Sequence, residues 1–311
     1  MATVAELYYN IGTRIQDPSN TRVEPWQLLR WINQAIRDTE RKSNHLKANI
    51  QLSGQRRVVV KDYSSLSGDI LSLKTSNDSA ETDYTEASEW TAETSNAVTA
   101  TNIATALDAH PDVEAYASFD NANTTYAYVY ITSKRGYTIS TFTSDADTDY
   151  MDVDNNGHEI FELSKIITNF RQVRNIYDTD QQLFYRPYTR QQYDRTQNDS
   201  EYAGYGYYVD PLYKMYIKIA GGNLDSGDTF KMDYSYWSTA LTAATESPAG
   251  ILAYFDELII QKVMYYYFQS EAKYNDMNVA DGLWRTEVKE LQQEIKSQGE
   301  LQPLKQFYQW H

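Results

Sequence analysis

The fold is decided by residues 248–298, which read PAGILAYFDELIIQKVMYYYFQSEAKYNDMNVADGLWRTEVKELQQEIKSQ. Apolar residues recur there in two runs at steps of three and four, the spacing of one helical face. The first run, about Ala249–Ser270, follows a proline. The second run, about Met277–Ser297, precedes Gly299 at a C-cap position. The polar break between the runs is short, which predicts an antiparallel helix hairpin.

A hairpin of this kind has two apolar faces and needs a third element to cover it. The best candidate is Glu24–Ser43, which lies more than 200 residues earlier in the chain. Its apolar stripe, at helical spacing, consists of Trp26, Leu29, Ile32 and Ile36. Two capping-box patterns, Thr3-Val-Ala-Glu6 and Thr21-Arg-Val-Glu24, predict the start of a short N-terminal helix and the start of this covering helix.

Short β-rich segments separated by turn residues fill residues 50–74 and 151–240. Leu212–Ile219 and Thr229–Trp237 flank a glycine pair and predict a β-hairpin. We therefore expect an α+β fold. A helical hub made of residues 1–45 and 248–297 should carry an antiparallel β-rich part.

Residues 75–150 differ in composition from the rest of the chain. They hold eight Asp and five Glu against two basic residues, Lys134 and Arg135, and so carry −11 of the total net charge of −15. The run Thr101–His110 predicts a short helix capped by Thr101, and three strands are expected to follow it. We expect this block to be an inserted α+β subdomain, so that the host domain consists of residues 1–74 and 151–297.

Composition excludes several classes of protein. The chain has no cysteine, which excludes disulfides and thiolate metal sites. No apolar run approaches the ~20 residues that span a bilayer, so no membrane anchor is expected. The net charge of −15 argues against a general nucleic-acid binder, because phosphate contacts need Lys and Arg. The 28 tyrosines suit either protein contact surfaces or β-strands.

Catalytic motifs are missing, so we predict neither catalytic residues nor a cofactor, and expect a protein that is not an enzyme. One run, Asp152-Val-Asp154-Asn-Asn156-Gly157, matches the first six positions of a calcium-binding loop. The twelfth position should be a bidentate Glu but is Leu163. An ordinary Asp/Asn/Gly turn is the simpler interpretation. A calcium site at Asp152, Asp154 and Asn156 is the alternative.

Three sets of residues are candidates for contacts with other molecules. Arg30, Arg37 and Arg41 share one side of the covering helix, which is either a solvated face that pairs with Glu24, Asp38 or Glu40, an intersubunit face or a face turned towards nucleic acid. Trp90 is either a core residue or a candidate for stacking on a sugar. The C-terminal tail, residues 298–311, is rich in apolar and aromatic side chains, unlike a disordered terminus, so it either folds back on its own domain or docks on another subunit. Its candidate docking residues are Leu301, Pro303, Leu304, Phe307, Tyr308 and Trp310.

The order of these elements resembles a known family of proteins. The motifs that carry the resemblance are WQLLRWINQAIR (Trp26–Arg37), LSKI (Leu163–Ile166), YTRQQY (Tyr188–Tyr193), MDYSYW (Met232–Trp237) and FDELII (Phe255–Ile260). Over residues 1–74 and 151–297 the chain is similar to the head-to-tail adaptor proteins, or head–tail connectors, of tailed double-stranded-DNA bacteriophages.

The resemblance implies a structural virion protein at the head–tail junction, assembled in the cytoplasm of the host bacterium. Such proteins form a ring, typically a homododecamer, beneath the portal protein, and extend the DNA channel towards a tail nozzle or another tail protein. Double-stranded DNA passes without specific binding. The C-terminal tail would dock on the portal. The alternative is another tail or baseplate component whose 75–150 block binds carbohydrate.

Overall fold

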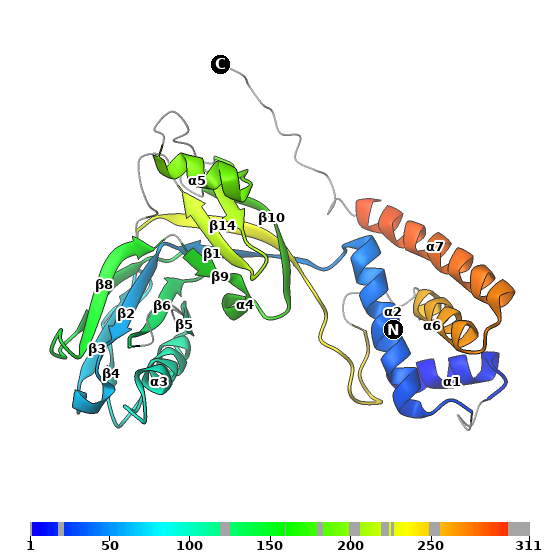
Figure 1. Cartoon of the computed structure of the whole chain (residues 1–311), viewed down its shortest axis with the longest axis horizontal. Helices are drawn as coiled ribbons and strands as arrows, with labels where there is room; N and C mark the ends of the chain where they lie inside the picture. Colours follow the sequence, from blue (N-terminus) through cyan, green and yellow to red (C-terminus); the bar gives the residue numbers. More distant parts are fainter. Residues whose placement is uncertain are drawn as a thin grey trace, which may run out of the picture. The chain divides into compact units, whose positions relative to one another are not determined.

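The computed structural model describes residues 2–17, 22–118, 125–158, 160–178, 183–198, 206–218, 224, 227–248 and 256–297. Within these ranges the chain has seven α-helices and fourteen strands, most of them antiparallel, so the predicted α+β class is confirmed (Figure 1). The chain divides into two compact units. One consists of Met1–Lys47 and Ser235–His311, and the other of Ala48–Tyr234.

The first unit is the helical hub, built from both ends of the chain. Its helices are α1 (Val4–Arg14), α2 (Pro25–Ser43), α6 (Asp256–Ser270) and α7 (Tyr274–Ser297). All four contribute to one apolar core. Helices α6 and α7 pack against each other and α2 packs against both, so the predicted hairpin and its covering helix are confirmed. The predicted start of the first hairpin helix, residues 249–255, lies outside the described residues.

Local sequence explains how the first two helices begin. Thr3 Oγ1 accepts a hydrogen bond from Glu6 N at 3.3 Å, and Thr3 N donates to the Glu6 carboxylate at 2.8 Å, so the first capping box is confirmed. The second is wrong, because the N-cap of α2 is Glu24, which makes no side-chain capping bond. Pro25 starts α2 instead, since its fixed φ suits the first helical turn.

Trp26 is 63% exposed, so its predicted place in the apolar stripe is wrong. The buried face of α2 is turned slightly from the predicted one. It consists of Leu28, Ile32, Ala35, Ile36, Thr39, Glu40 and Ser43. The neighbouring elements decide which edge of an amphipathic helix is covered, and sequence periodicity alone does not.

A return segment, residues 235–248, leads from the last strand back into the hub. Asn33 on α2 holds it with two hydrogen bonds to Leu241, from Nδ2 to O at 3.0 Å and from N to Oδ1 at 2.8 Å. The buried Glu40 carboxylate accepts from Ser238 N at 3.1 Å. These bonds satisfy backbone groups that regular structure leaves without partners, and they fix the return segment along α2.

The strands of the chain form four sheets. They are β1 (Lys47–Ser53), β2 (Gln55–Val60), β3 (Ile70–Thr75), β4 (Thr82–Thr85), β5 (Val113–Ser118), β6 (Ala127–Ser133), β7 (Ile139–Ser144), β8 (Met151–His158), β9 (Ile160–Glu162), β10 (Phe170–Asp178), β11 (Arg186–Pro187), β12 (Gly206–Val209), β13 (Lys214–Lys218) and β14 (Thr229–Tyr236). The strand orders are β1-β14-β10, β11-β12-β13-β9, β5-β6-β2-β8 and β4-β3-β7. Three further helices are α3 (Asn96–Asp108), α4 (Leu163–Ile166) and α5 (Arg190–Asn198).

The acidic module has wider limits than its composition indicates. Strands β2 and β3, which begin before residue 75, pair with β6 and β7 inside the predicted block. One core, which includes Val58, Leu71, Ile103 and Val129, lies between these strands and α3. The structure therefore places the module at about residues 55–158. The charge that distinguishes residues 75–150 lies mostly on exposed side chains. The limits of the module are set instead by its buried apolar residues, which extend beyond this block on both sides.

Two predicted elements differ in the structure. Strand β13 pairs with β12 and β9, whereas β14 lies between β1 and β10, so the predicted hairpin of residues 212–237 is wrong. The connection between the two strands is long enough to carry the chain from one sheet to another. Helix α3 starts at Asn96, with Ser95 Oγ accepting from Val98 N, so Thr101 is not its cap.

Candidate functional site

Clusters of His, Asp and Glu give no metal site in the described part of the chain, where no group of three or more could hold an ion. The described helices also include none that is long and apolar enough to cross a membrane. The search for a functional site therefore turns to the individual candidates and to the surfaces of each unit.

The Asp152–Gly157 run lies in strand β8, so the turn interpretation is wrong. Asp154 forms an ion pair with Arg57 at 2.9 Å, and Asp152 lies 3.7 Å from Lys61. Arg57 belongs to β2, the strand that pairs with β8, and Lys61 directly follows β2. A strand spaces alternate side chains about 7 Å apart, whereas a calcium loop wraps its ligands around the ion. The side chain of Asn156 lies outside the described residues. The run therefore serves the pairing of β8 with β2.

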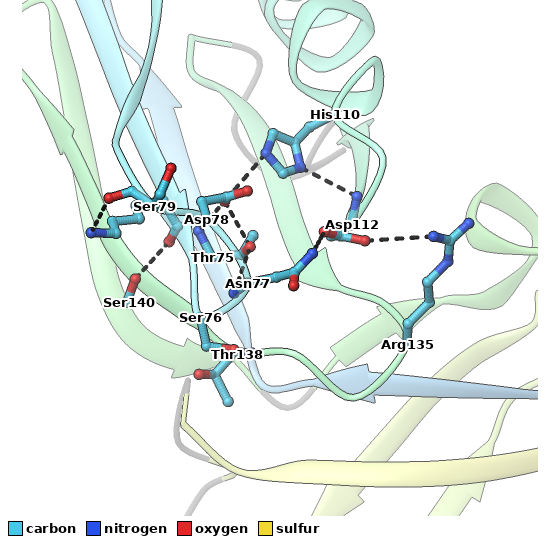
Figure 2. A network of polar contacts seen from close by, with 11 residues as sticks. Thr75, Ser76, Asn77, Asp78, Ser79, His110, Asp112, Arg135, Thr138 and Ser140 are labelled. Atoms are coloured by element: carbon cyan, nitrogen blue, oxygen red, sulfur yellow. Dashed lines mark hydrogen bonds and ion pairs between the residues drawn. The ribbon is translucent and has the colours of Figure 1, made fainter.

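A polar network ties the turn after β3 to the turn after α3 (Figure 2). His110 Nε2 lies 3.4 Å from the Asp78 carboxylate, and His110 Nδ1 accepts a hydrogen bond from Asp112 N at 3.2 Å. Asn77 Nδ2 donates to Asp112 at 2.8 Å. Burial raises the pKa of Asp78, but hydrogen bonds from Thr75 and from His110 offset this, so its pKa falls below the ordinary value.

Both ring nitrogens of His110 are engaged, and the residue is 7% exposed. A general base needs a free nitrogen within reach of a substrate proton. Arg135 adds a contact from the turn after β6, with its guanidinium 3.7 Å from the Asp112 carboxylate (Figure 2). The network therefore holds together the turns after β3, α3 and β6 in the acidic module.

Trp90 is buried, with 3% of its surface exposed, and its Nε1 donates to Tyr84 O at 3.0 Å. It belongs to the core of the acidic module. Stacking on a sugar needs an exposed ring face, so the sugar-stacking alternative for Trp90 is wrong and its core interpretation is confirmed. The carbohydrate alternative thereby loses Trp90.

The three arginines of α2 do not act as one surface. The Arg37 guanidinium lies 5.1 Å from the centre of the Trp237 ring and 3.6 Å from Glu40, so it packs against the return segment. Arg41 lies 3.8 Å from Asp38 and lines a groove. Arg30 is exposed. Arg37 and Arg41 thus pair with Glu40 and Asp38, as the solvated-face interpretation predicts, whereas the intersubunit face and the nucleic-acid face stay predictions.

The groove that Arg41 lines lies between α2, α6 and α7 and has a volume of about 510 Å³. We call it the basic groove. Its lining residues are Asp38, Arg41, Lys42, Lys262, Tyr265, Asp281, Trp284, Arg285, Val288, Lys289 and Gln292. Five of these side chains are cations and two are carboxylates, so the groove has a net charge of +3 in a chain of −15.

Lys262 forms the floor of the basic groove, with 7% of its side chain exposed. Its Nζ lies 3.4 Å from Asp281 and 3.9 Å from Asp38. The same atom lies 4.0 Å from the centre of the Trp284 ring and 4.1 Å from that of Tyr265. A buried ammonium needs such partners, because the loss of water disfavours its charge. Asp281 also accepts a hydrogen bond from Arg285 Nε at 2.7 Å, and Arg41 lies 3.8 Å from Asp38, so both carboxylates pair with other cations of the groove as well, while the side chains of Lys42 and Lys289 are exposed.

Tyr266 completes this buried network. Its hydroxyl donates to the Asp38 carboxylate at 2.6 Å. Burial, followed by this bond to an anion, raises the pKa of Tyr266 well above its ordinary value, so the phenol stays protonated as a donor. One signal for the site is visible in the sequence, namely a lysine inside the mostly apolar run Leu258–Tyr267.

A second hollow, of about 610 Å³, lies beside α1 and the start of α6. We call it the acidic hollow. Its lining residues are Ala2, Ala5, Glu6, Tyr9, Asn10 and Asp256. Asp256 accepts a hydrogen bond from Ala2 N at 2.8 Å. Hydrogen bonds from the backbone and hydroxyl of Thr3 lower the pKa of Glu6. The donors in these bonds are neutral groups, so they leave the negative charge of both carboxylates in place.

The predicted docking tail, residues 298–311, lies outside the described residues. A scan against protein-family models and a search of curated proteins both found no match for this chain.

Proposed function

We propose that this chain is a non-enzymatic structural protein of a bacteriophage virion. It assembles into a ring that joins the portal vertex to the tail and extends the DNA channel. The observation that carries the proposal is the helical hub. Helices α1 and α2 from the start of the chain share one core with α6 and α7 from its end, and the β-rich unit is inserted between them. This is the order of elements on which the resemblance to head-to-tail adaptors rests.

The surface of the hub supports an assembled state. Large apolar side chains lie exposed on three of its helices, namely Tyr9 at 66%, Trp26 at 63%, Tyr274 at 64%, Val279 at 63% and Leu283 at 48%. Val279 and Leu283 stand one helical turn apart on α7. Assembly into a ring would remove some of this apolar surface from water, which favours association.

The net charge of the chain supports a channel wall that DNA passes without being bound. A wall of net charge −15 repels phosphate, so DNA can move past it without being held. The acidic module adds to this repulsion, because most of the described acidic side chains of residues 75–150 are exposed. In this role the protein positions other components and catalyses no reaction.

Sedimentation velocity with the cognate portal ring tests the proposal. We expect the chain to move onto the portal and form a complex of fixed stoichiometry, with one copy or more per portal subunit position. A portal ring from an unrelated phage is the matched control and should bind nothing. If the chain sediments apart from its cognate portal at every ratio, the adaptor function is wrong.

A further inference from the structure

The hub carries two hollows of opposite charge. The basic groove has a net charge of +3, and the acidic hollow holds two carboxylates that no cation neutralises among its lining residues. Both hollows belong to one unit, so their relation to each other is fixed by the packing of the hub. The question is what each hollow contacts.

The two hollows open on opposite sides of α6. Asp256 lines the acidic hollow and Tyr265 lines the basic groove. They are nine residues apart, and a helix turns by 100° per residue, so their side chains leave α6 about 180° apart. Helix α6 packs against α1 on one side and α7 on the other. One copy of the hub therefore cannot bring its own two hollows together.

The hollows also match in chemistry. Tyr9 stands 66% exposed at the acidic hollow. In the basic groove the Tyr265 ring is partly exposed, whereas Trp284 and Val288 are buried. The Tyr9 ring of a second copy would pack against Tyr265, while the carboxylates beside it meet the exposed side chains of Lys42 and Lys289. Aromatic anchors with complementary rim charges are typical of protein contacts.

We propose that the acidic hollow of one copy docks onto the basic groove of a second copy, with Tyr9 as the anchor. The contact is heterologous, because it joins two different surfaces that face opposite ways. Repetition of such a contact produces a closed ring or an open filament, and never a two-fold dimer. The inference rests on the proposed function only for ring closure; the contact itself rests on the two hollows.

Two charge-reversal variants test the contact. The groove variant is Lys42→Glu with Lys289→Glu, and the hollow variant is Tyr9→Lys with Asn10→Lys; all four side chains are exposed. The control variant, Lys296→Glu with Tyr274→Lys, changes exposed residues of α7 outside both hollows. We expect the first two variants to weaken self-association by about tenfold or more in sedimentation. The control should associate like the wild type.

Mixing the groove variant with the hollow variant gives the sharpest result. The groove variant keeps an intact acidic hollow, and the hollow variant keeps an intact groove. The mixture should therefore associate through these two unaltered surfaces, although each variant alone stays monomeric. An unchanged thermal transition for each variant shows that it is folded.

Cysteine cross-linking tests the contact even if the wild-type chain associates only on the portal. The chain contains no cysteine, so Asn10→Cys and Lys289→Cys introduce one thiol each. We expect the mixed pair to form a disulfide-linked dimer, while Asn10→Cys mixed with Lys296→Cys does not. The absence of this cross-link both in solution and on the portal would overturn the inference. So would self-association that survives both charge reversals.

The outcomes also separate this inference from the proposed function. If the chain forms a ring on the portal but the cross-link fails, the adaptor function stands and only the contact is wrong. If the variants associate as expected but the chain ignores the portal, the contact stands without the adaptor function. A fluorescein-labelled oligothymidylate is added to the wild type as well. Tight binding that abolishes self-association would assign the groove to nucleic acid instead.

Discussion

Lys262 shows how one residue organises a surface. It lies in the apolar core of the hub, and its charge is held by Asp38, Asp281 and two aromatic rings. Removal of one partner from a buried ion pair leaves the remaining charge without compensation, which costs more than the pair itself contributes. The two aspartates would then repel each other at the floor of the basic groove.

Substitution Lys262→Met should therefore destabilise the hub by about 3 kcal/mol. Methionine keeps the length and the packing of the side chain, so the loss reports the charge. Urea denaturation followed by far-UV circular dichroism measures it. The control Lys296→Met, at an exposed position of α7, should stay within about 0.5 kcal/mol of the wild type. Equal losses in both variants would contradict the role assigned to Lys262.

The sequence shows where the tryptophans lie in the chain but not which residues surround them in the fold. Trp26, Trp90 and Trp284 all lie in segments with apolar neighbours, yet they are 63%, 3% and 4% exposed. Exposure depends on which element covers a side chain, and that element is often distant in the chain. For the same reason the basic groove could not be predicted, because its residues come from helices more than 200 residues apart.

At the scale of elements, the turn Arg135-Gly136 directs the chain from β6 towards β7. Both residues have positive φ, 63° and 81°. A Cβ on Gly136 would lie 2.6 Å from the Gln51 side chain, whereas a Cβ on Gly68, whose φ is 72°, would meet nothing within 4 Å. The two glycines therefore share the backbone strain and differ in the space around them.

Substitution Gly68→Ala should destabilise the β-rich unit by about 1 kcal/mol through backbone strain alone. Gly136→Ala should lower stability further, because Gln51 must also move. Chemical denaturation of the two variants, monitored by the unfolding transition of the β-rich unit, gives the comparison. A smaller loss for Gly136→Ala than for Gly68→Ala would contradict the crowding seen at Gln51.

The contact between α1 and α6 depends on pH. The Arg14 guanidinium forms two 2.6 Å hydrogen bonds with the Glu257 carboxylate. Partial burial raises the pKa of Glu257, but the bonds from Arg14 and Gln261 and the charge of Arg14 lower it below its ordinary value of 4.5. A lowered pKa means that the stabilisation is complete above pH 4.5 and is lost as the pH falls through the folded value.

Comparison of the wild type with Glu257→Gln measures this dependence. The wild type should be more stable above pH 4.5, and the difference should shrink as the pH falls below it. Thermal unfolding of the hub at a series of pH values gives both curves. A difference that stays constant across the acid range would show that the pair does not titrate with folding.

The helices could be predicted because their signals are local. Thr3 and Glu6 cap α1 within one turn, and the apolar spacing of α6 and α7 is visible in a single stretch. Strand partners could not be predicted in the same way. Strands β13 and β14 follow each other in the sequence but do not pair, because β13 pairs with the preceding strand β12 and the distant β9, whereas β14 pairs with β1 and β10. Partner choice depends on long-range burial, which no short window contains.

At the scale of the whole molecule, the acidic module is a candidate for independent folding. Its core residues all lie between Val58 and Val153, and both of its sheets are complete within residues 55–158. Residues 55–158 expressed alone should therefore give a cooperative thermal transition. Excision of residues 75–150 should give insoluble protein, because it removes the partners of β2 and β3. A soluble, folded excision product would restore the narrower boundary.

The tail prediction belongs to the proposed function. Removal of residues 298–311 should leave the unfolding transition of the hub unchanged, since α1, α2, α6 and α7 already share an apolar core within the described residues. Binding to the portal should be lost in sedimentation. A truncated chain that has lost its unfolding transition would instead show that the tail belongs to the core.

Strands β1 and β14 are neighbours in one sheet, and Tyr236 N donates to Leu46 O at 3.3 Å where the two strands meet the hub. The chain thus leaves the hub and re-enters it at a single point. A gene segment whose product begins and ends at adjacent strands can be exchanged for another with the same ends, without any change to the four helices. Recombination between related genes would then be able to replace the whole β-rich unit while the hub stays constant.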